Sequence, residues 1–233
     1  MKREKKKTGR LKKVLFSILI VVLTVAGLAL IFNEQIKSFV VNHISTTALD
    51  KPIQKKHPKK GNFNYESVKP IDTKDVAKAA ATNTEGSIGK IAIPEVGIHL
   101  PIFYGLAQNN LMRGAGTMKP NEQMGEIGNY ALAGHHMEDN NILFGPLENI
   151  GVGAKIYVTD GKKVYTYKVT RKVTVNESQV QWIDDVPGKK LITLVTCSSG
   201  QEGVKTRIIV RGELADVQDA NKSTLKVFEK QGI

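Results

Sequence analysis

The chain has 233 residues, with 34 Lys and Arg against 22 Asp and Glu, so its formal charge at neutral pH is +12. The first 13 residues hold eight basic side chains and one acid, which is a net +7, and the remaining 220 residues carry only +5. The charge is therefore concentrated at one end and does not indicate the basic binding face of a nucleic-acid-binding protein. A single cysteine, Cys197, excludes an internal disulfide framework.

An uncharged apolar run over residues 14–32 follows the basic segment. A run of about 20 apolar residues matches the hydrocarbon thickness of a bilayer, and basic residues beside a span stay in the cytoplasm. The sequence predicts a cytoplasmic tail over 1–13, a single transmembrane anchor over 14–32 and an extracellular remainder. The alternative, a cleaved signal peptide, has an apolar region of only about 7–15 residues and a better cleavage site than Ala26-Gly27-Leu28-Ala29.

Residues 33–83 are rich in Lys, Pro and Thr and have no sustained apolar period beyond a short stretch at 39–44. This composition predicts an extracellular stalk or linker. Within it, residues 72–82 predict a short helix capped by Asp72 or Thr73. The lysines in this segment suit an anionic surface of lipid or wall polymer, although a solvated linker explains them as well; they are Lys51, Lys55, Lys56, Lys59 and Lys60.

Short strands dominate the chain from residue 84 to residue 215. The Asp160-Gly161 pair between two alternating runs is a strong hairpin signal. Turns every 8–12 residues, with only short helical stretches between, predict an all-β fold, a closed or nearly closed barrel of about eight strands. The tail over 216–233 predicts a short helix packed on the barrel, with no assigned function. Strands are predicted at 88–94, 98–104, 130–134, 154–159, 164–169, 190–197 and 206–214.

Four chemically active side chains fall at predicted strand ends. Cys197 ends one strand, His135 and His136 end a second, and Arg207 begins the strand that returns from Cys197. The cysteine and the histidines also have plainer explanations, as a buried thiol and as satisfied structural histidines. Together they suit acyl transfer, in which a thiolate attacks a carbonyl, an imidazole moves the proton and a guanidinium stabilises the oxyanion.

The same residues resemble the signature of the sortase family. The run Thr193-Leu194-Val195-Thr196-Cys197 is similar to the family's TLxTC motif, the histidine strand end to its catalytic histidine, and Arg207 to its arginine. The chain looks like a class A, housekeeping sortase of a Gram-positive bacterium, with the similarity covering about residues 88–214. The resemblance implies an eight-stranded barrel outside the membrane, and cleavage of an LPxTG sorting signal between Thr and Gly through a thioester. The acyl group would pass to the amine of a cell-wall precursor.

The resemblance also implies roles for individual residues. Cys197 would be the nucleophile, His135 the general acid and base, and Arg207 the stabiliser of the oxyanion or substrate. The loop at 176–189 corresponds to the family's mobile substrate loop. Residues implied to contact substrate, each with an ordinary packing role as the alternative, are Ala133, His136, Val180, Trp182, Ile183 and Thr196.

Some members of this family bind calcium through acids in the loop before the histidine strand and in the substrate loop. Here the first of these loops holds only Glu122 and Glu126, together with Lys119. Calcium takes 6–8 oxygen ligands, so we expect no calcium requirement. One cysteine and an adjacent histidine pair do not form a tetrahedral zinc set, and no cofactor is expected.

Two other functions fit the same sequence. A thiol peptidase would use the same residues with water as the acceptor. A membrane-tethered module binding wall polymer or protein would bury Cys197 and would leave the coincidence of cysteine, histidine and arginine at strand ends unexplained.

Overall fold

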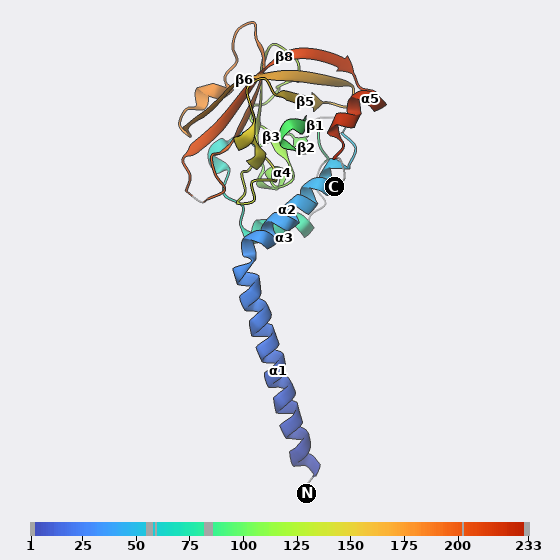
Figure 1. Cartoon of the computed structure of the whole chain (residues 1–233), viewed down its shortest axis with the longest axis vertical. Coiled ribbons are helices and arrows are strands. Elements are labelled where there is room, and N and C mark those ends of the chain that lie inside the picture. Colours follow the sequence, from blue (N-terminus) through green and yellow to red (C-terminus); the bar gives the residue numbers. More distant parts are fainter. Residues whose placement is uncertain (1–2, 55–57, 59, 82–85, 202, 231–233) are drawn as a thin grey trace. The chain divides into compact units, whose positions relative to one another are not determined.

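The computed structural model describes residues 3–54, 58, 60–81, 86–201 and 203–230 (Figure 1). Parts of the expected basic tail (1–2), stalk and lysine cluster (55–57, 59, 82–83) and C-terminal tail (231–233) lie outside these residues. The chain divides into two compact units, Met1–Lys37 and Ser38–Ile233.

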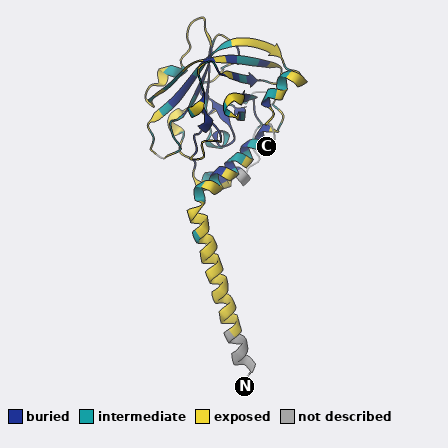
Figure 2. Cartoon of the chain, viewed as in Figure 1, coloured by how far each residue is buried: buried dark blue, intermediate teal, exposed yellow. Residues whose placement is uncertain are grey.

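The first unit is dominated by one helix, α1 (Arg3–Ile31). Residues Arg10–Ile31 are long and apolar enough to cross a membrane, and none of that stretch is buried (Figure 2). A helix that is apolar on all sides and is not buried among the described residues has the character of a membrane span.

Helix α2 (Asn33–Leu49) lies where the sequence predicted an extracellular stalk or linker. Val41 is fully buried and belongs to the main hydrophobic core, together with Ile71 and Val76. Residues from Ser38 onward therefore belong to the compact unit, which is a correction to the stalk predicted over 33–83. The helix was missed because much of its buried stripe is small or polar, so it has little hydrophobic period; the stripe is Ser38, Val41, Ser45, Ala48 and Leu49.

Helix α3 (Thr73–Ala81) confirms the helix predicted near residue 72. The Asp72 carboxylate accepts a hydrogen bond from the Asp75 backbone N–H at 2.6 Å, as an N-cap does. Val76 and Ala79 are buried on the core side of this helix, which ties the segment to the barrel.

The second unit is a closed barrel of eight strands, as predicted, in the order β1-β2-β3-β4-β7-β8-β6-β5. Pairs β2–β3 and β4–β7 are parallel and the others antiparallel. The strands are β1 (Gly89–Ile93), β2 (Ile98–Phe103), β3 (Ala115–Thr117), β4 (Gly128–Ala133), β5 (Lys155–Thr159), β6 (Lys163–Asn176), β7 (Lys190–Cys197) and β8 (Thr206–Asp219).

Individual strands differ from the prediction where the apolar pattern is weak. Strand β3 was missed because it is three small or polar residues long. Strands β6 and β8 each run for 14 residues, well beyond their apolar segments, because they pair with each other along their whole length. The predicted hairpin is present, with Thr159 paired to Val164 and Gly161 at φ +84°.

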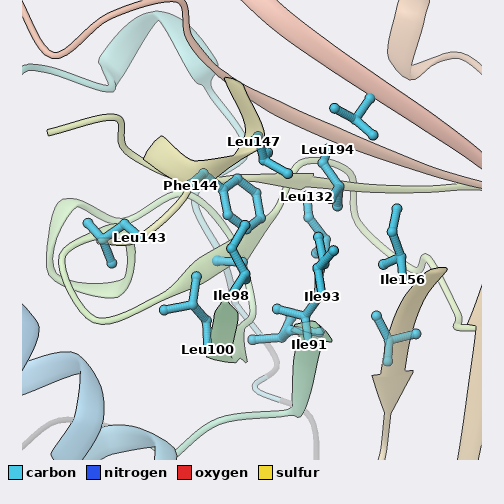
Figure 3. Packing of buried hydrophobic residues seen from close by; sticks show 14 of the residues in the cluster. Ile91, Ile93, Ile98, Leu100, Leu132, Leu143, Phe144, Leu147, Ile156 and Leu194 are labelled. Atoms are coloured by element: carbon cyan, nitrogen blue, oxygen red, sulfur yellow. The ribbon is translucent and has the colours of Figure 1, made fainter. Parts of the chain in front are cut away.

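The barrel interior is filled by branched aliphatic side chains and Phe144 (Figure 3). The remaining helices are short: α4 (Gln108–Leu111), α5 (Lys222–Leu225) and the 3-10 turns η1 (Tyr65–Ser67), η2 (Pro94–Val96), η3 (Gly145–Asn149), η4 (Val180–Ile183) and η5 (Lys226–Phe228). The expected C-terminal tail begins inside β8, which ends at Asp219. Its helical part packs on the barrel through Phe228, in contact with Ala92 and Val164.

Candidate active site

The face of β4 and β7 that points away from the barrel interior carries a second apolar cluster. Successive side chains of a strand point to opposite faces. Since Leu132 and Leu194 lie in the interior core, Ala133, Val195 and Cys197 share the outer face. We call this the outer cluster; it consists of Val68, Leu106, Leu111, Met118, Ala131, Ala133, Ile183 and Val195.

Cys197 ends β7 on the same face as the outer cluster, two residues beyond Val195. Its thiol is free and partly exposed. Burial raises the pKa of the Cys197 thiol, Arg207 lowers this pKa, and Glu177 raises it. The net direction is upward, so at neutral pH the resting group is the thiol rather than the thiolate.

Arg207 lies directly opposite Cys197 in the antiparallel pairing of β7 with β8. Its guanidinium donates to Glu177 Oε2 at 2.7 Å and to the backbone oxygens of Val204 at 2.8 Å and Thr206 at 3.1 Å. The expected return of the strand is therefore confirmed, and a cation stands beside the thiol. Nothing in the sequence pointed to its acidic partner, Glu177, which follows the end of β6.

His135 follows the end of β4, next to the end of β7. The Gly134 N–H donates to Val195 O at 3.1 Å, extending the parallel ladder one residue past Ala133. One more step in that register would pair His135 with Cys197, and the next residue, His136, reaches the backbone oxygen of Cys197. The ring is buried, Nε2 has no hydrogen-bond partner among the described residues, and burial lowers the pKa of His135 to about 4. His135 is therefore neutral at physiological pH.

His136 is also buried but faces different partners. Its Nδ1 lies 2.8 Å from the backbone oxygen of Cys197, and its Nε2 lies 3.0 Å from Asn140 Oδ1. Both ring nitrogens are thus occupied by hydrogen bonds within the chain.

The predicted substrate loop crosses the outer face through η4. Ile183 joins the outer cluster, and Val180 is 41% exposed. Trp182 packs instead over two guanidinium groups, with Arg211 Cζ 5.0 Å and Arg171 Cζ 5.6 Å from the ring centroid. The loop backbone is fixed by the Asn129 amide, which donates to Trp182 O at 3.0 Å and to Asp184 O at 3.1 Å.

Two other residues expected to contact substrate, Ala133 and Thr196, lie on opposite faces of the sheet. Ala133 lies in the outer cluster. Thr196 is only 2% exposed and alternates with Cys197, so it shares the interior face with Leu194. Val68, which comes from the segment before the barrel, was not expected in the outer cluster because a lone valine in a polar stretch gives no signal.

A lysine occupies the loop before β4. Lys119 Nζ lies 2.7 Å from Asp185 Oδ1 and 3.4 Å from Glu122 Oε1. Asp185 also accepts the Asn129 backbone N–H at 2.8 Å, so this ion pair links the loop before β4 to the substrate loop. Within the described part of the chain, no three His, Cys, Asp or Glu residues gather as a set that could hold a metal ion.

The closed barrel, with a thiol, a guanidinium and an imidazole at adjoining strand ends, defines a cysteine enzyme of the acyl-transfer type. A family model for the sortase domain matches residues 91–215. Sortase A of Streptococcus agalactiae is 40% identical over 98% of this chain and 97% of that protein, and sortase A of Listeria monocytogenes is 38% identical over 87% and 92%. The crystal structure of the Listeria monocytogenes enzyme superposes with a TM-score of 0.59 and 40% identity, covering 62% of this chain and 98% of that one.

The chain belongs to the sortase family. It is a cysteine transpeptidase that matches the class A sortases of Gram-positive bacteria. The fold class and enzyme class expected from the sequence are thereby confirmed.

Proposed function

We propose that this sortase cleaves LPxTG-type signals between Thr and Gly and joins the new acyl end to the amine of a cell-wall precursor. The observation that carries the proposal is the position of Cys197, opposite Arg207 and at the end of the outer cluster. An apolar patch leading to a nucleophile suits a signal that begins with Leu-Pro and is cut after the second residue that follows the proline.

Acylation begins from a neutral thiol and a neutral imidazole. The Cys197 proton passes to His135 as sulfur attacks the threonine carbonyl carbon, and Arg207 stabilises the oxyanion that forms. When the intermediate collapses, the C–N bond breaks and His135 returns the proton to the departing glycine amine. The product is a thioester between Cys197 and the threonine.

Deacylation reverses these roles. The incoming amine attacks the thioester carbonyl and gives a proton to His135, and the C–S bond then breaks. The sulfur takes the proton back as it leaves, so the enzyme regains its thiol. No redox partner is needed, and a peptide bond is exchanged for a peptide bond.

We assign substrate contact to Ala133 and Ile183, because both belong to the outer cluster. Val180 is exposed on the same loop and is suited to contact the signal's apolar end. Trp182 serves better as a loop anchor over Arg171 and Arg211. The interior position of Thr196 and the internal hydrogen bonds of His136 give no support for direct contact with substrate by either residue.

We also propose that α1 spans the membrane with its basic end in the cytoplasm and the barrel outside. The lysine and arginine excess before the apolar stretch supports this orientation. Surface proteins bearing the signal and the wall precursor would then meet the enzyme at the outer membrane face.

The loop held by Lys119 supports independence from calcium. The ammonium group already neutralises Asp185 and contacts Glu122, so a second cation there would have to displace it. Turnover by the full chain should be the same in chelator and in millimolar calcium; strong loss in chelator would contradict this part of the proposal.

Mass spectrometry of the full chain in detergent with an LPxTG peptide tests the reaction directly. Wild type should give threonine-terminated product joined to an added glycine amine, and Cys197→Ala should give none. Arg207→Lys keeps the charge but loses the planar fork, and should turn over slowly. Hydrolysis without ligation would favour the thiol peptidase, and an untouched peptide would overturn the proposed substrate.

A further inference from the structure

A side chain replaces a backbone hydrogen bond where β4 leaves β7. The ladder runs through Gly134 N–H to Val195 O, and the next acceptor in the same row is the carbonyl oxygen of Cys197. That oxygen lies 2.8 Å from His136 Nδ1. A carbonyl oxygen can only accept, so Nδ1 of His136 must carry a hydrogen.

The other side of the ring leads to a carboxylate. His136 Nε2 lies 3.0 Å from Asn140 Oδ1, and Asn140 Nδ2 donates to Glu148 Oε1 at 2.8 Å. An ionised carboxylate only accepts hydrogen bonds, so Glu148 fixes the amide with its NH₂ group toward itself and its oxygen toward His136. Nε2 of His136 must therefore also carry a hydrogen.

Both nitrogens of His136 are donors, which describes an imidazolium ion. We infer that the His136-Asn140-Glu148 chain holds this cation on the carbonyl of Cys197 and that His136 is a positioning residue for the nucleophile. The ring is 6% exposed, and a charge so buried needs a partner, which Glu148 supplies across the amide. The inference rests on the proposed role of Cys197 as the nucleophile.

The cation has two effects on the reaction. It fixes the strand end that carries the thiol, and its charge favours the thiolate that forms during attack. The adjoining histidines thus divide the work: His135 stays neutral to accept a proton, and His136 stays charged to hold the sulfur's backbone.

Other charged groups near this chain set the background for any pH measurement. Cys197 faces Arg207 from β8 and Glu177 from the end of β6, and His136 contacts its backbone oxygen. The backbone oxygen of Glu148 accepts from Lys172 Nζ of β6 at 2.5 Å. Glu138 and Asp139 are exposed on the loop that leads to Asn140.

The protonation state can be measured directly on the full chain in detergent. The chain has only five histidines, so ring-¹⁵N-labelled histidine gives few signals, and His136→Asn identifies those of His136. At pH 7 both His136 nitrogens should give signals typical of protonated nitrogen. One unprotonated nitrogen on His136 would overturn the inference.

Glu148→Gln is the matched variant, because glutamine keeps the shape but can present its own NH₂ group to Asn140. The amide is then free to turn, and His136 should lose a proton and become neutral at pH 7. The Glu148 side chain is on the partly exposed rim, so this variant carries the test even where His136→Asn fails to fold. An imidazolium that persists in Glu148→Gln would overturn the assigned relay.

Alkylation of Cys197 by iodoacetamide as a function of pH measures the effect on the nucleophile. In His136→Asn the amide can still donate to the Cys197 carbonyl, but the charge is gone. The thiolate titration should move to higher pH, with the rate at pH 7 falling about tenfold for a shift of about one pH unit. Glu148→Gln should move it in the same direction. Unchanged profiles in both variants would contradict the positioning role.

These readouts separate the inference from the proposed function. Peptide ligation that survives Cys197→Ala would remove the proposed nucleophile, whatever the histidine signals show. Loss of ligation in Cys197→Ala together with a neutral His136 in wild type would remove only the relay.

Discussion

Cys197 and Arg207 are cross-strand partners where β7 ends and β8 begins, and the Arg207 guanidinium donates a hydrogen bond of 2.7 Å to Glu177. The Cys197 thiol therefore lies near both a cation, Arg207, and an anion, Glu177. Arg207 lowers the pKa of Cys197, while Glu177 raises it, and burial raises it further. The net effect is that Cys197 is a thiol in the resting enzyme. A change in either neighbouring charge should shift the pKa of this thiol.

Glu177→Gln should make Cys197 more reactive. Glutamine still accepts from Arg207 but carries no charge, so the thiolate is favoured and the alkylation profile moves to lower pH. The ion pair is partly exposed, with side chains 26% and 44% accessible, so the expected gain at pH 7 is modest, about two- to fivefold. Iodoacetamide kinetics check this; a profile that moves to higher pH would mean that Glu177 acts by positioning Arg207.

The buried His135 should make the fold sensitive to acid. Burial lowers the pKa of His135 from 6.5 to about 4, so between these values the unfolded chain binds more protons than the folded chain. The contribution of neutral His135 to the free energy of unfolding is fully present above pH 6.5. It decreases as the pH falls toward 4, and about 2 kcal/mol of it is lost at pH 5.

His135→Asn removes this titration and tests the sign. Urea unfolding at pH 7.5 and pH 5.0 should show wild type losing about 2 kcal/mol more than the variant over that interval. Cys197→Ala is the control, because it retains the imidazole and should follow wild type. Equal losses in wild type and His135→Asn would show that the ring is not buried in its neutral form.

The sequence was sufficient for the barrel because alternation and turn signals mark most of its strands. It also placed Cys197, His135 and Arg207 at adjoining strand ends, since polar groups at the ends of apolar runs stand out, while their catalytic roles stay a prediction. Helix α2 was hidden because small residues such as Ser45 fill its packed face. Tertiary packing stabilises this helix, and the apolar pattern of its sequence does not indicate it.

The site's supporting contacts were also beyond the sequence. The pairing of Glu177 with Arg207 joins residues 30 positions apart, and Asn129 reaches the loop carbonyl of Trp182 across 53 positions. Such contacts depend on strand register and loop path. The identity of a polar loop residue does not predict which distant residue it will contact in the folded chain.

Lys119→Ala should loosen the substrate loop. The ammonium group links Glu122 of the loop before β4 to Asp185, and without it these carboxylates lose their shared cation. Partly exposed pairs contribute up to about 1 kcal/mol, so KM for the signal peptide should rise about two- to fivefold with kcat nearly unchanged.

Steady-state ligation kinetics measure this split, and alkylation of Cys197 should stay at the wild-type rate. Lys155→Ala, at the exposed first position of β5, is the control and should leave both constants unchanged. A fall in kcat with constant KM would place the effect of Lys119 on the chemical step rather than on the loop.

Ala133→Leu tests whether the outer cluster receives the substrate. The extra carbons project from β4 onto the face that carries Val195 and Cys197, where they take the space that we propose for an apolar side chain of the signal. Overpacking of this kind costs about 1–3 kcal/mol, so kcat/KM for the peptide should fall about tenfold or more.

Iodoacetamide is small and should still react at the wild-type rate with Cys197 in the Ala133→Leu variant, and the unfolding midpoint reports any general damage to the fold. Ala215→Leu, at an exposed position of β8, should leave ligation unchanged. Normal ligation by Ala133→Leu would mean that the peptide reaches Cys197 without crossing the outer cluster.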